Sequence, residues 1–217
     1  FMESMLEFAG LRREDITDVI ISSVVPPVLV PLCHMCERYF KDKPMVVGQG
    51  TKIGLKLRYE NPKEIGADRI VNAVAAYDKY ADKNKPMIII DFGTATTFCA
   101  LLPTGEYLGG AICPGIGISA EALFQKTAKL PRIELLPPKK AICGNTVSAM
   151  RAGIMYGYYG LIKEVVAQMK AELGGEAFVI ATGGFANTMT QGTDCIDVVD
   201  PMLTLEGLRI IFDKNKR

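Results

Sequence analysis

Residues 88–97 read Ile-Ile-Ile-Asp-Phe-Gly-Thr-Ala-Thr-Thr, and this stretch says more about the fold than any other. An apolar run that ends on one carboxylate, Asp91, predicts a buried strand, and the following glycine and threonines predict a turn into a second strand. Gly93 lets the backbone approach a ligand closely, the amides and hydroxyls of the turn can donate to phosphate oxygens, and Asp91 can face a cation. The alternative is a tight hairpin with polar turn residues, and so short a motif does not separate the two.

The composition limits the class of protein. With 217 residues, of which 49% are hydrophobic, the chain can bury a substantial core as one large domain or two small ones. Its formal net charge of +1 gives no global electrostatic reason to bind nucleic acid or an anionic membrane. No apolar run approaches the length of a membrane span, and no signal peptide is visible. We therefore expect no nucleic acid and no membrane among its partners.

The cysteines favour a cytoplasmic protein with reduced thiols. Of the six cysteines only Cys33 and Cys36 lie close together, and the sole histidine, His34, lies between them. A tetrahedral zinc site needs a second pair of cysteines, or histidines, so core thiols are favoured over zinc or redox chemistry. A single histidine also argues against a Ser-His-Asp or Cys-His mechanism.

The first half of the chain alternates helices and short strands. Helical apolar spacing is found at residues 1–10, 28–40 and 66–80. Strands are predicted at residues 18–25, 44–47 and 53–59. Asn61 and Pro62 are typical of a helix start, as cap and first helical residue. A polar linker over residues 79–85 predicts the main boundary, between domains at 1–85 and 86–217.

The second half contains a β-hairpin and a long helix. Strands are predicted at residues 87–91, 97–102, 107–112 and 178–181, and helices at 119–128, 147–173 and 203–212. Small and aromatic residues line one stripe of the long helix, namely Ala149, Gly153, Tyr156, Gly157 and Gly160. That stripe is either a dimer seam or ordinary core packing. The mixture of elements predicts an α/β or α+β fold.

A second polar segment, Gly66-Ala67-Asp68-Arg69, lies at a predicted helix start. Asp68 can accept a proton from a substrate hydroxyl, and Arg69 can bind an anionic or polar substrate. The alternative is an aspartate favoured by the helix macrodipole beside a surface arginine, an arrangement that is common.

Two more segments place small and polar residues at the ends of elements. Thr182-Gly183-Gly184 follows a predicted buried strand, and its glycines either let a flat ligand lie against bare backbone or form a plain strand-to-helix turn. Gly144-Asn145-Thr146 precedes the long helix, where Asn145 or Thr146 either caps the helix or contacts a ligand.

Taken in order along the chain, these segments resemble type III pantothenate kinases. The resemblance runs through almost the whole sequence, and several motifs in the correct order are far more specific than any one of them. The matching segments are Ile21–Pro27, Asn61-Pro62 with Gly66–Arg69, Asp91–Thr96, Gly109–Gly115, Asn145-Thr146 and Ala181–Gly184.

The resemblance implies a fold and an activity. It implies an α/β fold of the actin-like ATPase (ribonuclease H-like) type, with two lobes, mixed sheets, and the nucleotide in the cleft between the lobes. It also implies transfer of the ATP γ-phosphate to the primary hydroxyl of pantothenate, which gives 4'-phosphopantothenate in the first step of coenzyme A synthesis. Family members act as homodimers with Mg²⁺ and a monovalent cation, K⁺ or NH₄⁺.

The same resemblance implies roles for particular residues. Asp68 matches the general base, Asp91 the monovalent-cation ligand, and Thr146 a threonine that reaches pantothenate from the partner subunit. Pantothenate contacts are implied for Tyr59, Gly66, Ala67, Asp68 and Arg69. ATP contacts are implied for Gly93 and Thr94 on the phosphate side and for Thr182, Gly183 and Gly184 on the adenosine side.

Two features depart from the family pattern. The family begins with a strand that ends in Asp-x-Gly-Asn-Thr, and no such motif occurs here. We expect the N-terminal strands of the first lobe to lie upstream of Phe1, so that the chain as written lacks half of the phosphate cradle and is not a competent kinase. Cys143 and Gly144 also replace the usual glycine and basic residue before Asn145.

Two other functions remain open. Some homologues of these kinases act as accessory factors in transcription and not as enzymes. Asp68, Arg69, Asp91 and Thr94 favour the kinase, because a regulator needs no base beside a cation site. The Gly66–Arg69 segment also argues against a sugar or acetate kinase of the same superfamily.

Overall fold

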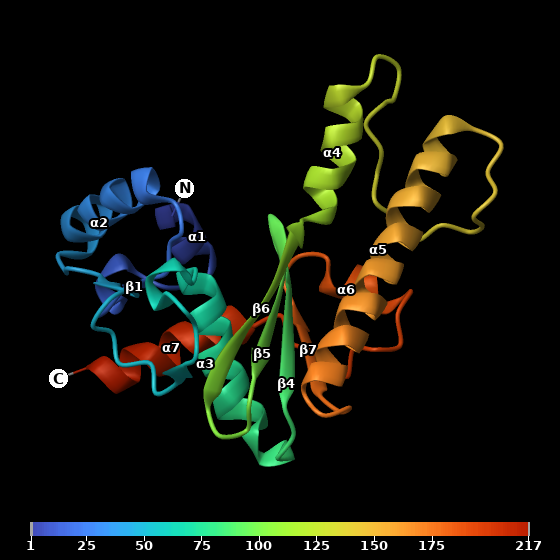
Figure 1. The fold of residues 1–217 in the computed structure, drawn as a ribbon. Helices are drawn as coiled ribbons and strands as arrows, with labels where there is room; N and C mark the ends of the chain where they lie inside the picture. The colour runs from blue at the N-terminus through green and yellow to red at the C-terminus, as the bar shows by residue number, and fades with distance from the viewer. Residues whose placement is uncertain (1, 217) are drawn as a thin grey trace.

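A mixed β-sheet at the centre of the molecule organises the other elements. The computed structural model describes residues 2–216, and six of its strands form one sheet in the order β3-β6-β5-β4-β7-β8 (Figure 1). The strands are β3 (Lys56–Leu57), β4 (Met87–Phe92), β5 (Ala95–Leu101), β6 (Glu106–Pro114), β7 (Phe178–Thr182) and β8 (Val198–Val199). β5 is antiparallel to both β4 and β6, whereas β7 runs parallel to β4. The predicted mixed α/β fold is confirmed.

Strand β4 is apolar along its length because its two faces both meet helices. Ile88, Ile90 and Phe92 belong to the core on one face of the sheet. Met87 and Ile89 belong to the core on the other face. Successive side chains of a strand point to opposite faces, so Asp91 lies on the same face as Met87 and Ile89.

Two helical layers cover the sheet from opposite sides (Figure 1). On one side, α5 (Thr146–Glu172) buries Met155, Ile162 and Val166 against the face that carries Ile88 and Ile90. On the other side, α3 (Ala67–Tyr80) contributes alanines to the second core, which also takes in Leu203 of α7 (Leu203–Asn215). The remaining helices of this half are α4 (Ile116–Lys126) and α6 (Ala186–Thr190).

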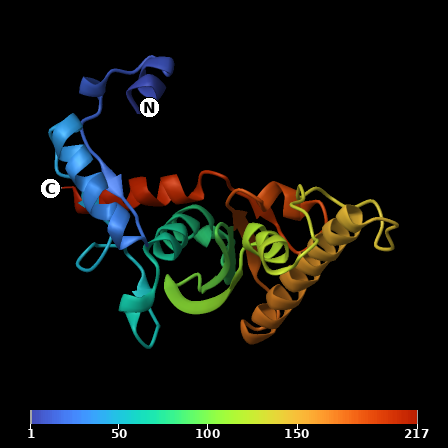
Figure 2. The ribbon, with the colours of Figure 1, turned by 90° about the horizontal axis from the view of Figure 1, so that it is seen from above.

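The N-terminal part lies at one end of the molecule and α5 at the other (Figure 2). It comprises α1 (Met2–Phe8), β1 (Ile20–Ile21), α2 (Pro26–Phe40) and β2 (Met45–Val46), and β1 pairs with β2 in parallel. A third core joins this part to α3 and α7, with Val47 packed among Val71, Val74 and Ile211. Helix α3 therefore contacts both the N-terminal part and the central sheet.

Some predicted boundaries were wrong. The strand predicted at 18–25 is only Ile20–Ile21, and the one at 53–59 is only Lys56–Leu57, because a strand extends only where a partner strand continues the pairing. Helix α2 begins at Pro26 and not at residue 28, because the first helical residues need no hydrogen-bond donor and therefore tolerate proline. Elements α6 and β8 were not predicted, since segments this short carry no clear periodicity.

Other predictions at the helix starts are confirmed. Asn61 caps a short 3₁₀ turn, Pro62–Glu64, and accepts a hydrogen bond from the amide of Lys63 at 3.3 Å. Helix α3 then begins directly after Gly66. Helix α1 covers most of the helix predicted at 1–10, of which Phe1 lies outside the described residues.

Candidate functional site

Asp91 lies where two glycine-containing turns meet. Asp91 is the next-to-last residue of β4, and the parallel pairing of β4 with β7 places it opposite Thr182. The turns that follow these neighbouring strands, Gly93-Thr94 and Gly183-Gly184, therefore lie at the same edge of the sheet. All four turn residues are exposed, whereas Thr182 is buried, so a ligand would meet the glycines before the Thr182 side chain.

Gly183 is a glycine because no side chain fits there. Its backbone φ of +91° lies in the left-handed region that favours glycine. A Cβ at this position would lie 2.7 Å from Asp91 Oδ1 and 2.7 Å from the backbone nitrogen of Phe92. The β7 turn is thus pressed against the end of β4, and Oδ1 of Asp91 faces it.

The Gly93-Thr94 turn is held in place by Gly115, the residue before α4. Its amide donates to the carbonyl oxygen of Thr94 at 3.0 Å, and a Cβ on Gly115 would overlap that same carbonyl. Gly93 donates to the carbonyl of Ala95 at 3.2 Å and closes the turn. The turn is therefore a fixed loop whose outer surface is open to solvent.

Burial and neighbouring charge both act on Asp91. Burial is the main reason that the pKa of Asp91 lies above its ordinary value, and the negative charge of Asp68 raises it further. The hydrogen bond from Asn72 Nδ2 to Asp91 Oδ2, at 2.9 Å, opposes that rise. A cation near Oδ1 would relieve the cost of holding this charge away from water.

Asp68 lies one helical turn before Asn72, whose side chain donates to Asp91, and its negative charge acts on that carboxylate. It occupies the first turn of α3, is half-buried, and accepts a hydrogen bond from the amide of Arg69 at 2.9 Å. A Cβ on Gly66 would overlap the Asp68 carboxylate, so the glycine before the helix gives this side chain its room. The structure therefore brings together two carboxylates that are 23 residues apart in the sequence.

Arg69 is a buried guanidinium with a free hydrogen-bond donor, not the surface arginine of the alternative interpretation. Its exposed fraction is 5%, its Nε donates to Cys99 Sγ at 3.3 Å, and it lies 5.9 Å from the ring centre of Tyr107. Its Nη2 has no hydrogen-bond partner among the described residues. Tyr59 lies beside the same ring, with 6.4 Å between the centres of Tyr59 and Tyr107. An anionic or polar group could complete the hydrogen bonding of Arg69.

A cleft of about 610 Å³ borders the Gly66-Ala67 segment. Its wall includes Ser23, Val24, Ile65 and residues 47–51 of the N-terminal part. The size suits a small organic ligand. The cleft places the start of α3 opposite the N-terminal part of the molecule.

Thr146 lies apart from this site within one chain. It is exposed at the start of α5, a helix that packs on the opposite face of the sheet from α3. Asn145 caps the helix there by accepting a hydrogen bond from the amide of Ser148 at 2.9 Å, which confirms the capping interpretation. Cys143 donates to the carbonyl of Lys140 at 3.4 Å, so the unusual Cys143-Gly144 pair is part of an ordered turn.

The groups near Asp91 suit a hard cation better than a metal ion that needs several protein side chains as ligands. Within residues 2–216 no three His, Cys, Asp or Glu side chains are grouped to hold a metal ion. A single carboxylate oxygen between two backbone turns suits a hard cation with oxygen ligands, and Mg²⁺ at nucleotide sites is held largely by phosphates and water. In the same residues no helix is both long and apolar enough to cross a bilayer.

Sequence reasoning missed several residues of this site. Asn72, Cys99 and Tyr107 lie within regular elements and have no motif around them. Asn72 alone carried a signal that could have found it, because it is the one polar residue in the run Ile70–Ala76.

Comparison with known proteins found one matching family and proteins of similar fold. The family model for type III pantothenate kinase matches residues 1–168. A crystal structure from Campylobacter jejuni, described as a conserved candidate Baf family transcriptional activator, has a TM-score of 0.61 at 19% identity, over 97% of this chain and 88% of that one. An Alp12 filament structure matches 66% of this chain and 52% of that one, at 13% identity and a TM-score of 0.41. At 19% identity, the likeness to the Campylobacter protein is one of fold.

Proposed function

Because this chain belongs to the type III pantothenate kinase family, we propose that it transfers the γ-phosphate of ATP to the primary hydroxyl of pantothenate. The product would be 4'-phosphopantothenate, the first intermediate on the way to coenzyme A. One observation carries the proposal: Asp91 Oδ1 faces Gly183 where the parallel strands β4 and β7 end, and the two glycine-containing turns there are open to solvent. Phosphoryl transfer requires mainly positioning and charge neutralisation, and these groups can supply both.

The acceptor side of the site is assigned to the start of α3. Asp68 would accept the proton of the attacking hydroxyl, which requires only that the hydroxyl come within hydrogen-bond reach of the carboxylate. Arg69 would bind a polar or anionic part of pantothenate through its free Nη2, and Tyr59 would line the same wall. Gly66 and Ala67 border the cleft in which the rest of the substrate would lie.

The nucleotide side is assigned to the two turns. Gly93 and Thr94 would donate to phosphate oxygens, and Thr182, Gly183 and Gly184 would form the adenosine-side turn. Asp91 would hold a monovalent cation, K⁺ or NH₄⁺, through Oδ1, and Mg²⁺ would be bound chiefly by the phosphates. Bound cations supply charge neutralisation for the transferred phosphoryl group.

Assembly and architecture are part of the same proposal. We assign an actin-like fold of two lobes, residues 1–85 and 86–217, to a cytoplasmic homodimer. Thr146 would contact pantothenate bound to the partner subunit, a role supported by its exposure at the start of α5. The α5 stripe supports a close helix contact, because a Cβ on Gly153, Gly157 or Gly160 would meet nothing within 4 Å.

A coupled assay of ADP release tests the activity directly. The full-length protein should release ADP from ATP only when pantothenate is present, and faster in KCl than in NaCl. ADP release that does not depend on pantothenate would refute the assignment. The second candidate function, suggested by the resemblance in fold to the Campylobacter protein, is an accessory role in transcription without catalysis. That role predicts no pantothenate-dependent ADP release at all.

A further inference from the structure

Two hydrogen bonds connect Asp91 to the first turn of α7. Asn72 Nδ2 donates to Asp91 Oδ2 at 2.9 Å, and Thr204 Oγ1 donates to Asn72 Oδ1 at 2.7 Å. The three residues come from three elements, α3, β4 and α7. The exposed fraction of Asn72 is only 2%, so protein groups and not bulk water decide how its amide is oriented.

The direction of these bonds follows from the chemistry of the three groups. An ionised carboxylate only accepts hydrogen bonds, so Asn72 must turn its amide nitrogen toward Asp91. The amide oxygen then faces Thr204, whose hydroxyl can donate to it. A flipped amide would place an oxygen against the carboxylate and would lose the bond to Asp91. The Thr204 hydroxyl therefore selects the amide orientation that Asp91 needs.

The arrangement leaves one oxygen of Asp91 directed at a ligand. Asn72 engages Oδ2, while Oδ1 faces Gly183, where a Cβ would come within 2.7 Å of it. Gly93 lies on the same side, where a Cβ would be 3.5 Å from Oδ1. Because Oδ2 is held, the carboxylate plane cannot rotate freely, and Oδ1 keeps its direction between the two turns.

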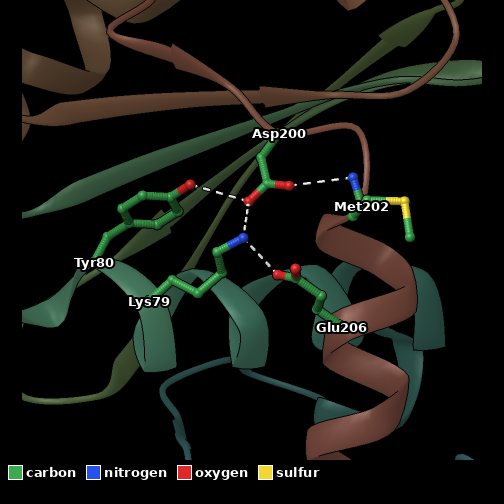
Figure 3. Close-up of polar contacts among 5 residues, drawn as sticks. All are labelled: Lys79, Tyr80, Asp200, Met202 and Glu206. Atoms are coloured by element: carbon green, nitrogen blue, oxygen red, sulfur yellow. Dashed lines mark hydrogen bonds and ion pairs between the residues drawn. The ribbon is translucent and has the colours of Figure 1, made fainter.

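Helix α7 is a firm support for Thr204. Gly207 packs so closely on α3 that a Cβ there would overlap the carbonyl of Val71. Just before the helix, Asp200 accepts from the amide of Met202 at 3.1 Å and from Lys79 Nζ of α3 at 2.6 Å (Figure 3). The helix is thus fixed to α3 on both sides of Thr204.

We infer that Asn72 and Thr204 are positioning residues that orient the Asp91 carboxylate toward a monovalent cation between the Gly93 and Gly183 turns. The inference rests on the proposed function, in which Asp91 binds that cation. Neither residue needs to touch the cation or a substrate. Residues that support a metal ligand in this way typically change metal affinity by about 10- to 100-fold when they are removed.

The substitution Thr204→Val tests the inference, because it keeps the shape of the side chain and removes the donor. Two readouts on the full-length protein are needed. One is the rise in Tm with KCl, at constant ionic strength made up with tetramethylammonium chloride, which reports cation binding without catalysis. The other is the KCl concentration that gives half-maximal ADP release with pantothenate. We expect both half-saturation concentrations to rise about tenfold.

Two control variants separate positioning from general loss of stability. Thr204→Ser keeps the hydroxyl and should respond to KCl as the parent does. Thr104→Val removes a hydroxyl bond to Glu106, of 2.9 Å, in the β5–β6 turn away from Asp91, and should leave the KCl response unchanged. If valine proves too poorly tolerated to fold, Thr204→Ala gives the same comparison.

The outcomes are distinct. A Thr204→Val protein with a lower Tm but the parental half-saturation by KCl would overturn the inference, because the bond would then only stabilise the fold. A parent whose Tm and activity both ignore KCl would also overturn it. A parent that responds to KCl in Tm, with the expected shift in Thr204→Val, but releases no ADP with pantothenate would refute the proposed function and support the positioning role.

Discussion

Charged side chains from several elements gather around both ends of α3, but only at one end do they all find partners within the fold. At the C-terminal end, Lys79 donates to Asp200 at 2.6 Å and to Glu206 at 2.5 Å, and Tyr80 donates to Asp200 at 3.0 Å (Figure 3). At the N-terminal end, Arg69 is buried with its Nη2 unpaired within the described residues, and Asp91 carries its charge in a half-buried position.

On the proposed function, the C-terminal end of α3 holds the structure together and the N-terminal end binds a ligand. Leaving a buried hydrogen-bond donor unpaired costs about 1–3 kcal/mol. Such a donor is therefore expected where a ligand can accept its hydrogen bond. At the other end Lys79 pairs with both Asp200 and Glu206, which indicates a structural role. Four measurements test this contrast.

The largest effect should come from Asp68→Asn. Removal of a general base typically lowers turnover by about 100- to 10,000-fold, while ATP binding and stability should remain. Pantothenate-dependent ADP release and nucleotide binding measure the two quantities separately. Asp78→Asn is the matched control, an exposed aspartate on the same helix, and should keep full turnover. Unchanged turnover in Asp68→Asn would falsify the assignment of the base.

The second largest effect should come from Asp200→Asn, at the C-terminal end of α3. One amide oxygen cannot replace two carboxylate oxygens that accept from Lys79, Tyr80 and Met202. We expect the free energy of unfolding to fall by about 2 kcal/mol, less than the 3–5 kcal/mol for a fully buried pair. The reason is that the Lys79 side chain keeps 31% of its exposure and can regain water.

Urea unfolding at pH 7 measures this loss, and turnover should change far less than in Asp68→Asn. The control is Glu176→Gln, which removes an exposed ion pair with Lys85 and should leave stability nearly unchanged. Equal stability of the Asp200→Asn and Glu176→Gln proteins would show that the Lys79 end is no more structural than the surface.

The third effect is a dependence of stability on pH. Burial raises the pKa of Asp200, but the hydrogen bonds from Lys79 and Tyr80 and the charge of Lys79 lower it more, so the pKa lies below its ordinary value of 3.8. A lowered pKa contributes stability above the unfolded value and loses it as the pH falls through the folded one. The stability difference between parent and Asp200→Asn should therefore be constant near pH 7 and shrink below about pH 4. A difference that grows on acidification would contradict the ion-pair role.

The smallest effect has the opposite sign and belongs to Asp91→Asn. The pKa of Asp91 is raised, chiefly by burial, so its charged form costs stability at neutral pH and this cost declines as the pH falls through the folded pKa. A neutral asparagine still accepts from Asn72, and we expect it to stabilise the cation-free protein at pH 7 by on the order of 1 kcal/mol. It should also abolish the rise in Tm with KCl. Destabilisation in the absence of KCl would show that the Asp91 charge is satisfied within the fold.

Local patterns were enough to predict most elements and part of the site. The apolar run before Asp91 predicts β4, and the Asn145 cap predicts the start of α5, because a strand core and a helix cap each depend on nearby residues. Local patterns could not show what Asn72 does. Its amide is decided by Thr204, 132 residues away, and by Asp91, 19 residues away.

The mixed α/β class, the family and the residue types at the two strand ends could be predicted without coordinates, because these follow from periodicity and from short motifs in a fixed order. What these residues can do depends on the folded arrangement. Parallel pairing of β4 with β7 places the two turns side by side, and the packing of α3 on the sheet buries Arg69 with a free donor. Burial, pKa and hydrogen-bond direction depend on neighbours that are distant in the chain, so only the folded arrangement distinguishes the open N-terminal end of α3 from its closed C-terminal end.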